Sequence, residues 1–214
     1  GEMRGELLIG ASAGIAEFML PPMLGEFNAL YPQVRARLIV ANSESIENRV
    51  AEPTLDLGLI ELPSKRPGLT SEMCRADELV VICAPDYPLA GSPEVTPKAL
   101  VEYEYISREP GSATREVTEA YFLKHKVSPD SLKMQMELGS PEALKGVVAT
   151  GLGFAIMASV AVESEVQQGQ LVAIPLKPRL KRSVHLIYQQ DRFRSRLADT
   201  FIKFVKIKLR EIAV

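Results

Sequence analysis

The feature that most constrains this fold is an alternation, along the whole chain, between short strand-like apolar runs and helix-like amphipathic segments. Residues 34–40 and 79–84 are short runs rich in Val, Ile and Leu, whereas residues 15–30 repeat their apolar positions at helical spacing. Alternation of this kind is typical of α/β proteins, in which helices cover both faces of parallel sheets. The chain is therefore predicted to be an α/β protein.

The pattern gives a specific order of elements, with turns marked by glycine, proline and helix-capping residues. The expected strands cover residues 7–9, 34–40, 55–60, 79–84, 103–107, 132–138, 154–157, 171–176 and 183–189. The expected helices cover residues 15–30, 45–52, a short segment from Thr96-Pro97, 112–126, 141–150, 160–168 and a C-terminal segment that includes 197–209. Pro21 and Pro22 are expected to kink or restart the first helix.

Composition excludes several functions for this chain. It has 25 Lys and Arg against 27 Asp and Glu, a formal net charge of −2, so no basic surface for nucleic acid or an anionic membrane is expected. No apolar run approaches the roughly 18 residues that cross a bilayer, and no secretory leader is visible. Cys74 and Cys83 lack any partner motif, which indicates inert thiols in a reducing cytoplasm. The sequence thus predicts a cytoplasmic protein without a membrane partner.

Parallel sheets bind ligands at the carboxyl ends of their strands, where the strand-to-helix loops gather. Three such loops consist of small residues directly before a helix. They are Ala11-Ser12-Ala13-Gly14, Gly111-Ser112-Ala113-Thr114 and Gly139-Ser140-Pro141. A helix start exposes unpaired N–H groups that favour an anion, although plain helix capping would use the same residues. Arg108 and Arg115 flank the middle loop and could bind an anion with a forked contact.

Several segments, taken in order, are similar to the effector-binding domain of LysR-type transcriptional regulators. They are residues 5–12 (GELLIGAS), 20–22 (LPP) followed by Phe27 and Tyr31-Pro32, 56–60 (DLGLI), 106–115 (ISREPGSATR) and 151–156 (GLGFAI). The stretch 106–115 resembles the members that sense small anions such as sulfur oxyanions or sugar phosphates. The resemblance covers essentially the whole chain.

The resemblance implies a two-lobed fold like that of type 2 periplasmic binding proteins, with two crossover strands joining the lobes. Regulatory lobe I would hold residues 1–83 and 180–214, and lobe II residues 84–179. It also implies that a winged helix-turn-helix normally precedes this domain and is absent from this chain. A homodimer or tetramer is expected, with DNA bound through that missing domain.

The predicted ligand site lies in the cleft between the lobes. Its residues are Ser12, Ala13, Asn42, Glu61, Arg108, Ser112, Thr114 and Ser140. Glu61 departs from the family pattern, because relatives often carry a neutral hydroxyl residue there, and a carboxylate repels an anion unless it is paired. No cofactor is expected, and no metal, since His125 and His185 have no Cys, Asp or Glu at metal spacing nearby.

The function predicted from these features is sensing of a small molecule, most consistent with a small anion, whose binding alters the arrangement of attached DNA-binding domains. One alternative is a periplasmic solute-binding protein for a small anion, which the two unpaired thiols disfavour. A second is an enzyme on the same fold, such as a dehydratase or deaminase. That reaction needs a general acid or base in the cleft, and Glu61 is the one candidate. The prediction is therefore a protein that is not an enzyme.

Overall fold

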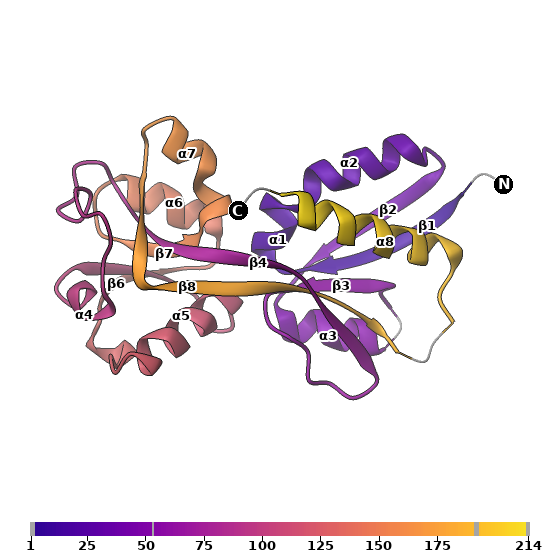
Figure 1. Ribbon diagram of the computed structural model, residues 1–214, viewed down its shortest axis with the longest axis horizontal. Coiled ribbons are helices and arrows are strands. Elements are labelled where there is room, and N and C mark those ends of the chain that lie inside the picture. The colour runs from indigo at the N-terminus through magenta and orange to yellow at the C-terminus, as the bar shows by residue number, and fades with distance from the viewer. Residues whose placement is uncertain (1–2, 53, 191–192, 213–214) are drawn as a thin grey trace. The chain divides into compact units, whose positions relative to one another are not determined.

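The computed structural model describes residues 3–52, 54–190 and 193–212 (Figure 1). The chain forms two compact units. The first comprises Gly1–Ala76 and Ser183–Val214, and the second comprises Asp77–Arg182. The chain passes twice from one unit to the other, once within strand β4 (Leu69–Cys83) and once within strand β8 (Val172–Gln189).

The sheet of the first unit has the strand order β2-β1-β3-β8. Its other strands are β1 (Gly5–Ala11), β2 (Val34–Val40) and β3 (Leu57–Ile60). β1 is parallel to β2 and to β3, whereas β8 is antiparallel to β3. The expectation of parallel strands thus holds for the three N-terminal strands and fails for β8, which returns from the second unit in the opposite direction.

Helices cover both faces of this sheet. They are α1 (Ala13–Phe18), α2 (Leu20–Leu30), α3 (Ser43–Ala51) and α8 (Arg196–Glu211). The break at Met19 between α1 and α2 confirms the expected effect of the two prolines, which occupy the first turn of α2, where proline is tolerated. α2 packs against α8 through the rings of Phe27 and Phe201, whose centroids lie 5.0 Å apart in an edge-to-face contact.

α3 lies very close to the sheet because two glycines stand beneath it. A Cβ atom on Gly58 would lie 2.5 Å from Cγ2 of Ile46, and one on Gly10 would lie 2.8 Å from Cδ1 of the same residue. Ile46 is fully buried in a cluster with Val50 and Ile60. The DLGLI motif therefore needs glycine so that α3 can approach β3.

The second unit is built in the same way with different connections. Its strands, besides β4 and β8, are β5 (Glu104–Arg108), β6 (Lys133–Leu138) and β7 (Ala155–Ala158). Its helices are α4 (Pro97–Leu100), α5 (Ala113–Lys124), α6 (Pro141–Ala149) and α7 (Glu163–Gln167), with 3₁₀ turns at Pro129–Ser131 and Ser159–Val162. β5 is parallel to β6, and β7 is antiparallel to β4.

Two strands are longer than the apolar pattern indicated. β4 has 15 residues and begins at Leu69, ten residues before the expected start. β8 has 18 residues and joins the two strands expected at 171–176 and 183–189 into one. In both strands the additional residues are rich in charged side chains, so hydropathy alone gave no strand signal there.

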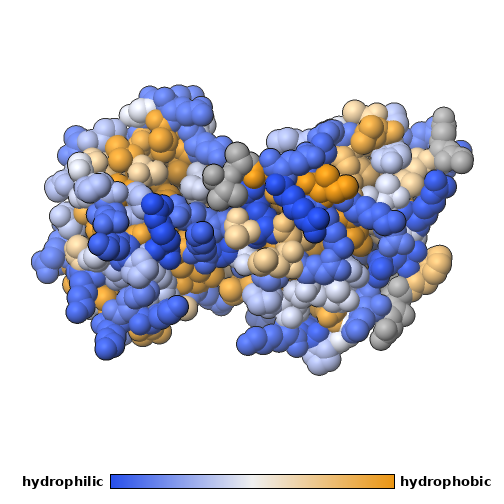
Figure 2. Space-filling model, viewed as in Figure 1, coloured by the Kyte–Doolittle hydropathy of each residue, from blue (hydrophilic) through white to orange (hydrophobic). Residues whose placement is uncertain are grey.

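The surface matches the charge balance of the sequence. Figure 2 shows mostly hydrophilic side chains on the visible face, with smaller apolar areas among them. Among the described residues, no helix combines the length and the apolar character needed to cross a membrane.

Candidate ligand-binding site

In the first unit, the predicted residues lie at the carboxyl ends of neighbouring parallel strands. Ser12 directly follows β1, and its N–H donates a 3.2 Å hydrogen bond to the carbonyl of Leu59 in β3. Asn42 follows β2, and Glu61 follows β3. Because parallel strands end at the same edge of a sheet, these residues share one edge of the first unit.

The side chains at this edge differ in what they are free to bind. The Asn42 carbonyl oxygen accepts a 2.8 Å hydrogen bond from the N–H of Ser45 and so caps α3. Ser12 stands at the start of α1 without making a side-chain cap, and its buried Oγ has no hydrogen-bond partner among the described residues. Ala13 is the first residue of α1, and Glu61 is buried.

In the second unit, α5 and α6 begin at one edge of the β5–β6 pair. Arg108 and Leu138 are paired residues at the carboxyl ends of these parallel strands. Ser112 caps α5 by accepting a 3.3 Å hydrogen bond from the N–H of Arg115, and Ser140 caps α6 in the same way through the N–H of Ala143, also at 3.3 Å. Thr114 lies in the first turn of α5. Two helix starts with positive partial charge therefore follow the same end of the β5–β6 pair.

The two arginines that flank the start of α5 already form ion pairs with acidic neighbours. Nε of Arg108 donates to Oε1 of Glu109 at 2.8 Å. Arg115 pairs with Glu119 at 2.8 Å and with Glu137 at 2.6 Å. These hydrogen bonds raise the pKa of Arg115, with the larger effect from Glu119 and the smaller from Glu137. A forked contact of both arginines with one anion is therefore not preformed. Arg108 is the better placed, because its Nε and Nη2 contact Glu109 while its Nη1 has no carboxylate partner among the described residues.

A buried arginine that the sequence analysis missed reaches the α5 start. Nη1 of Arg182 donates a 3.2 Å hydrogen bond to the hydroxyl oxygen of Thr114. Its Nη2 lies 3.4 Å from Oδ2 of Asp77, and both side chains are almost fully buried. Asp77 and Arg182 are the first and last residues of the second unit. In the sequence, apolar Leu180 and Val184 stand two residues before and two residues after Arg182, and this strand-like spacing could have placed Arg182 on the buried face.

The two cysteine thiols are poor nucleophiles. Burial raises the pKa of Cys83 to about 11 and also raises that of Cys74. The thiolate is the reactive form, so neither residue is suited to redox chemistry at neutral pH. Within the described ranges, no group of three or more His, Cys, Asp or Glu is placed to hold a metal ion.

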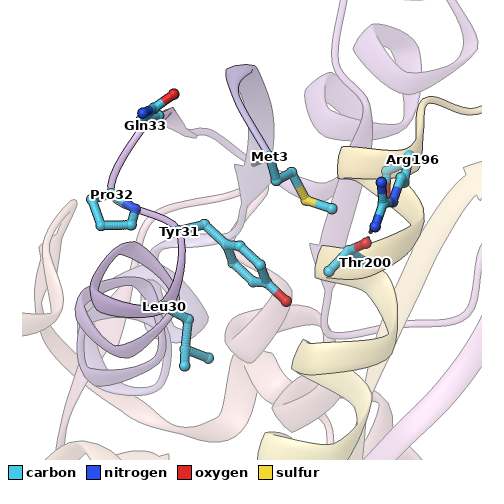
Figure 3. Close-up of a pocket in the computed structure, with 7 residues that line it drawn as sticks. All are labelled: Met3, Leu30, Tyr31, Pro32, Gln33, Arg196 and Thr200. Carbon is cyan, nitrogen blue, oxygen red and sulfur yellow. Dashed lines mark hydrogen bonds between the residues drawn. The ribbon is translucent and has the colours of Figure 1, made fainter. Parts of the chain in front are cut away.

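A pocket of about 410 Å³ lies at the other end of β1 from Ser12 (Figure 3). Tyr31 and Arg196 point toward it from the end of α2 and the start of α8, with Met3 between them. Its lining residues are Met3, Leu30, Tyr31, Pro32, Gln33, Arg196 and Thr200. None of the predicted ligand residues lines it, and it lies at the amino end of β1, away from the edge where α/β sheets bind ligands.

The structure thus groups the predicted residues into two sets. Ser12, Ala13, Asn42 and Glu61 share one strand edge of the first unit, and Arg108, Ser112, Thr114 and Ser140 share one strand edge of the second. Two α/β units, each with helix starts at its strand ends and joined by two continuous strands, define a ligand-binding domain.

Residues 1–210 match the family described as the LysR substrate binding domain, and the chain belongs to that family. It is 36% identical over 205 residues to the Escherichia coli protein called uncharacterized HTH-type transcriptional regulator YeiE, covering 95% of this chain and 68% of that one. It is 32% identical over 205 residues to a probable RuBisCO transcriptional regulator of Synechocystis, covering 94% of this chain and 59% of that one. These relatives are regulators and not enzymes, which confirms the prediction that the chain is not an enzyme.

Solved structures confirm the predicted fold class. The regulatory domain of CcmR from Synechocystis, described in complex with 2-PG, has a TM-score of 0.89 at 28% identity and covers 99% of this chain and all of that one. The effector-binding domain of QuiR, described in complex with shikimate, has a TM-score of 0.85 at 17% identity over 99% of this chain and all of that one. The chain is a LysR-type effector-binding domain with a periplasmic-binding-protein-like fold.

Proposed function

We propose that this domain binds a small anion at the strand ends described above and thereby changes how the attached DNA-binding domains of a cytoplasmic, oligomeric regulator are arranged. The observation that carries the proposal is the pair of adjacent helix starts at the end of the β5–β6 pair. α5 and α6 begin there with serine caps, next to the guanidinium of Arg108. Helix N-termini and arginine both favour anions.

The proposed site takes residues from both units. Ser112, Thr114, Ser140 and Arg108 would hold the anionic group, and Ser12, Ala13, Asn42 and Glu61 would contact the rest of the ligand. A ligand can shift a conformational equilibrium only if it binds one state better than another. A ligand held by residues of both units meets that condition, because its contacts depend on how the units are arranged.

Two structures of similar fold are described with small organic ligands. The CcmR domain is described with 2-PG and the QuiR domain with shikimate. The proposal extends only the class of ligand to this chain, since the identities of 28% and 17% do not identify the same compound.

A thermal-shift screen tests the proposal. The domain would be heated with sulfite, sulfate, phosphate, short carboxylates, a neutral sugar and a cationic amine. A ligand at 100 times its dissociation constant stabilises the folded state by about 2.7 kcal/mol, so a binding anion should raise Tm by several degrees. Thr114→Leu should abolish that rise by blocking the α5 start. Ala120→Leu, at an exposed position of the same helix, should leave it intact. Stabilisation by the sugar or amine alone would contradict the proposal.

A further inference from the structure

Three buried polar atoms of the first unit have no hydrogen-bond partner among the described residues. They are Oγ of Ser12, Oγ of Ser43 and Nδ1 of His185. The exposed fraction is 5% for Ser12 and 8% for His185. Buried polar atoms in folded proteins are nearly always paired, because each unpaired one costs free energy. Three such atoms in one region therefore indicate a polar group that they are arranged to hold.

Strand pairing brings Ser12 and His185 to the same edge of the sheet. The N–H of Ser12 donates to the carbonyl of Leu59 in β3. The next residue of β3, Ile60, is paired with His185 of β8. Since β1, β3 and β8 are consecutive strands of this sheet, Ser12 and His185 lie on either side of the end of β3.

Ser43 joins them from β2. The N–H of Ala41 donates a 3.2 Å hydrogen bond to the carbonyl of Ala11, which holds the end of β2 against the end of β1. Ser43 follows two residues later as the first residue of α3, a helix of nine residues. Its side chain therefore lies at the start of a helix, where backbone N–H groups are unpaired.

All three side chains belong to the face of the sheet that α3 covers. Residues opposite each other in an antiparallel pair share a face, so His185 is on the side of Ile60, which packs with Ile46 of α3. Gly10 also faces Ile46. Ser12 follows two residues later in extended backbone, so strand alternation places it on this same face.

The groups at this edge suit a neutral hydroxyl better than a second anionic group. Burial lowers the pKa of His185, so its imidazole is neutral at pH 7. Serine hydroxyls and a neutral imidazole can each donate or accept, which matches a hydroxyl group that does both. The charged side chain that follows β3 is the acidic Glu61, which disfavours an oxyanion.

We propose that Ser12, Ser43 and His185 hydrogen-bond a hydroxyl group of the effector, so that the effector is a small anion that also carries a hydroxyl. This inference rests on the proposed function, in which the anionic group itself is held at the α5 and α6 starts. His185 and Ser43 are specificity-determining residues in addition to those predicted from the sequence.

Anion pairs that differ by one hydroxyl test the proposal directly. Calorimetric titration would compare glycolate with acetate and lactate with propionate. The hydroxylated member of each pair should bind about tenfold more tightly or better, as one to two added hydrogen bonds predict. Equal affinity within both pairs, including the case in which only sulfate or phosphate binds, would overturn the hydroxyl subsite and leave the proposed function standing. No binding of any anion would overturn both.

Variants show whether the three named residues cause the preference. Asparagine places its amide near the position of Nδ1, whereas glutamine places it near Nε2. His185→Asn should therefore keep much of the preference, while His185→Gln and Ser43→Ala should reduce it to about twofold or less without changing the affinity for acetate. His125→Gln and Ser164→Ala are matched controls and should behave as the parent chain. A preference that persists in both His185→Gln and Ser43→Ala would contradict the proposal.

A spectroscopic readout works even if a variant folds poorly. The chain has two histidines, so a domain labelled with ¹⁵N-histidine gives two ring systems, and His125→Gln assigns them. Glycolate should shift the Nδ1 resonance of His185 while acetate leaves it near its ligand-free position. If calorimetry shows that glycolate binds but neither glycolate nor acetate shifts the Nδ1 resonance of His185, the proposed role of His185 is overturned.

Discussion

At the scale of single residues, pairing between charges determines what the arginines near α5 can offer a ligand. The sequence showed Arg108 and Arg115 beside a helix start. Glu119 follows Arg115 by four residues on α5, a spacing that predicts an ion pair, whereas the contact of Arg115 with Glu137 of β6 depends on the fold. Arg115 makes two close carboxylate contacts. Arg108 makes its contact with Glu109, whose side chain is 38% exposed. An exposed carboxylate can turn toward water when an anion arrives, so Arg108 remains available.

Removing the competing carboxylate should strengthen anion binding. Glu109→Gln is expected to raise the affinity of the best anion by roughly 1.4- to fivefold, the range given by partly exposed ion pairs of about 0.2–1 kcal/mol. Calorimetric titration measures the change, and Glu94→Gln, which pairs with Lys177 in the same unit, is the control. Weaker anion binding in Glu109→Gln would show that Glu109 itself contacts the ligand.

His185 should make stability depend on pH in a defined direction. Burial lowers its pKa in the folded state below the ordinary value of about 6.5. Below pH 6.5, the unfolded chain therefore binds more protons at this histidine than the folded chain does. The contribution of His185 to the free energy of unfolding is complete above pH 6.5 and is lost as the pH falls below it. Urea unfolding between pH 7.5 and 5 should show a shallower loss for His185→Asn than for the parent chain. An identical loss in both would contradict the buried, neutral imidazole.

At the scale of elements, local chemistry predicted where helices begin better than hydropathy predicted where strands end. Thr96, Ser112 and Ser140 cap their helices as expected. Gly151 follows α6 with φ +88°, the left-handed conformation for which glycine ends helices. The full lengths of β4 and β8 could not be predicted, because charged residues such as Arg75, which bonds the last carbonyls of α8, occupy their middle parts.

A cap variant separates structural from ligand-binding roles at α6. Ser140→Ala removes the acceptor for the N–H of Ala143 and is expected to lower the free energy of unfolding by about 1 kcal/mol. Urea unfolding without ligand measures this effect. Ser164→Ala, in the exposed first turn of α7, should change stability by less than half as much. A stability unchanged by Ser140→Ala would assign Ser140 to ligand binding alone.

The Asp77–Arg182 ion pair should stabilise the fold of the second unit, and Arg182 also holds the start of α5 through Thr114. Both side chains are buried, so removing one partner leaves an uncompensated charge, which typically costs 3–5 kcal/mol. Arg182→Met should therefore destabilise the domain strongly, and Asp77→Asn combined with Arg182→Met should recover part of the loss. Thr114→Val, which removes only the hydroxyl contacted by Arg182, should cost about 1 kcal/mol. Additive losses in the double variant would contradict a direct pair.

At the scale of the whole molecule, the surfaces that could join two copies of the chain are indicated by exposed apolar residues. The family resemblance implied a homodimer or tetramer, but the apolar side chains of α2 give little support for an interface, because Leu20, Met23 and Phe27 are buried in the first unit itself. Exposed apolar residues occur on the edge strands, with Val40 in β2 and Met134 and Met136 in β6, and also on the helices, with Leu30 in α2 and Leu123 in α5. Edge strands of this kind favour association.

We expect a self-complementary dimer in which helix 15–30 and strand 34–40 of one chain contact helix 112–126 and strand 132–138 of its partner. Light scattering at high micromolar concentration should give twice the mass of 23.5 kDa. Met136→Glu should shift the domain toward the monomer, and Leu152→Glu, at an exposed position outside these surfaces, should not. A monomer at this concentration would count against the arrangement.

The central claim is that the domain recognises a small anion, and titration calorimetry with and without Arg108 tests it most directly. The starts of α5 and α6 and the guanidinium of Arg108 favour an anion, since a charge-assisted hydrogen bond contributes about 1.5–3 kcal/mol and each helix start about 0.3–1 kcal/mol. The carboxylate of Glu61 acts against it. At least one of sulfite, sulfate, phosphate or a short carboxylate should bind, and Arg108→Ala should weaken it about tenfold or more. If none of these anions binds, or if Arg108→Ala binds the best of them equally well, the account of this domain as an anion sensor is contradicted.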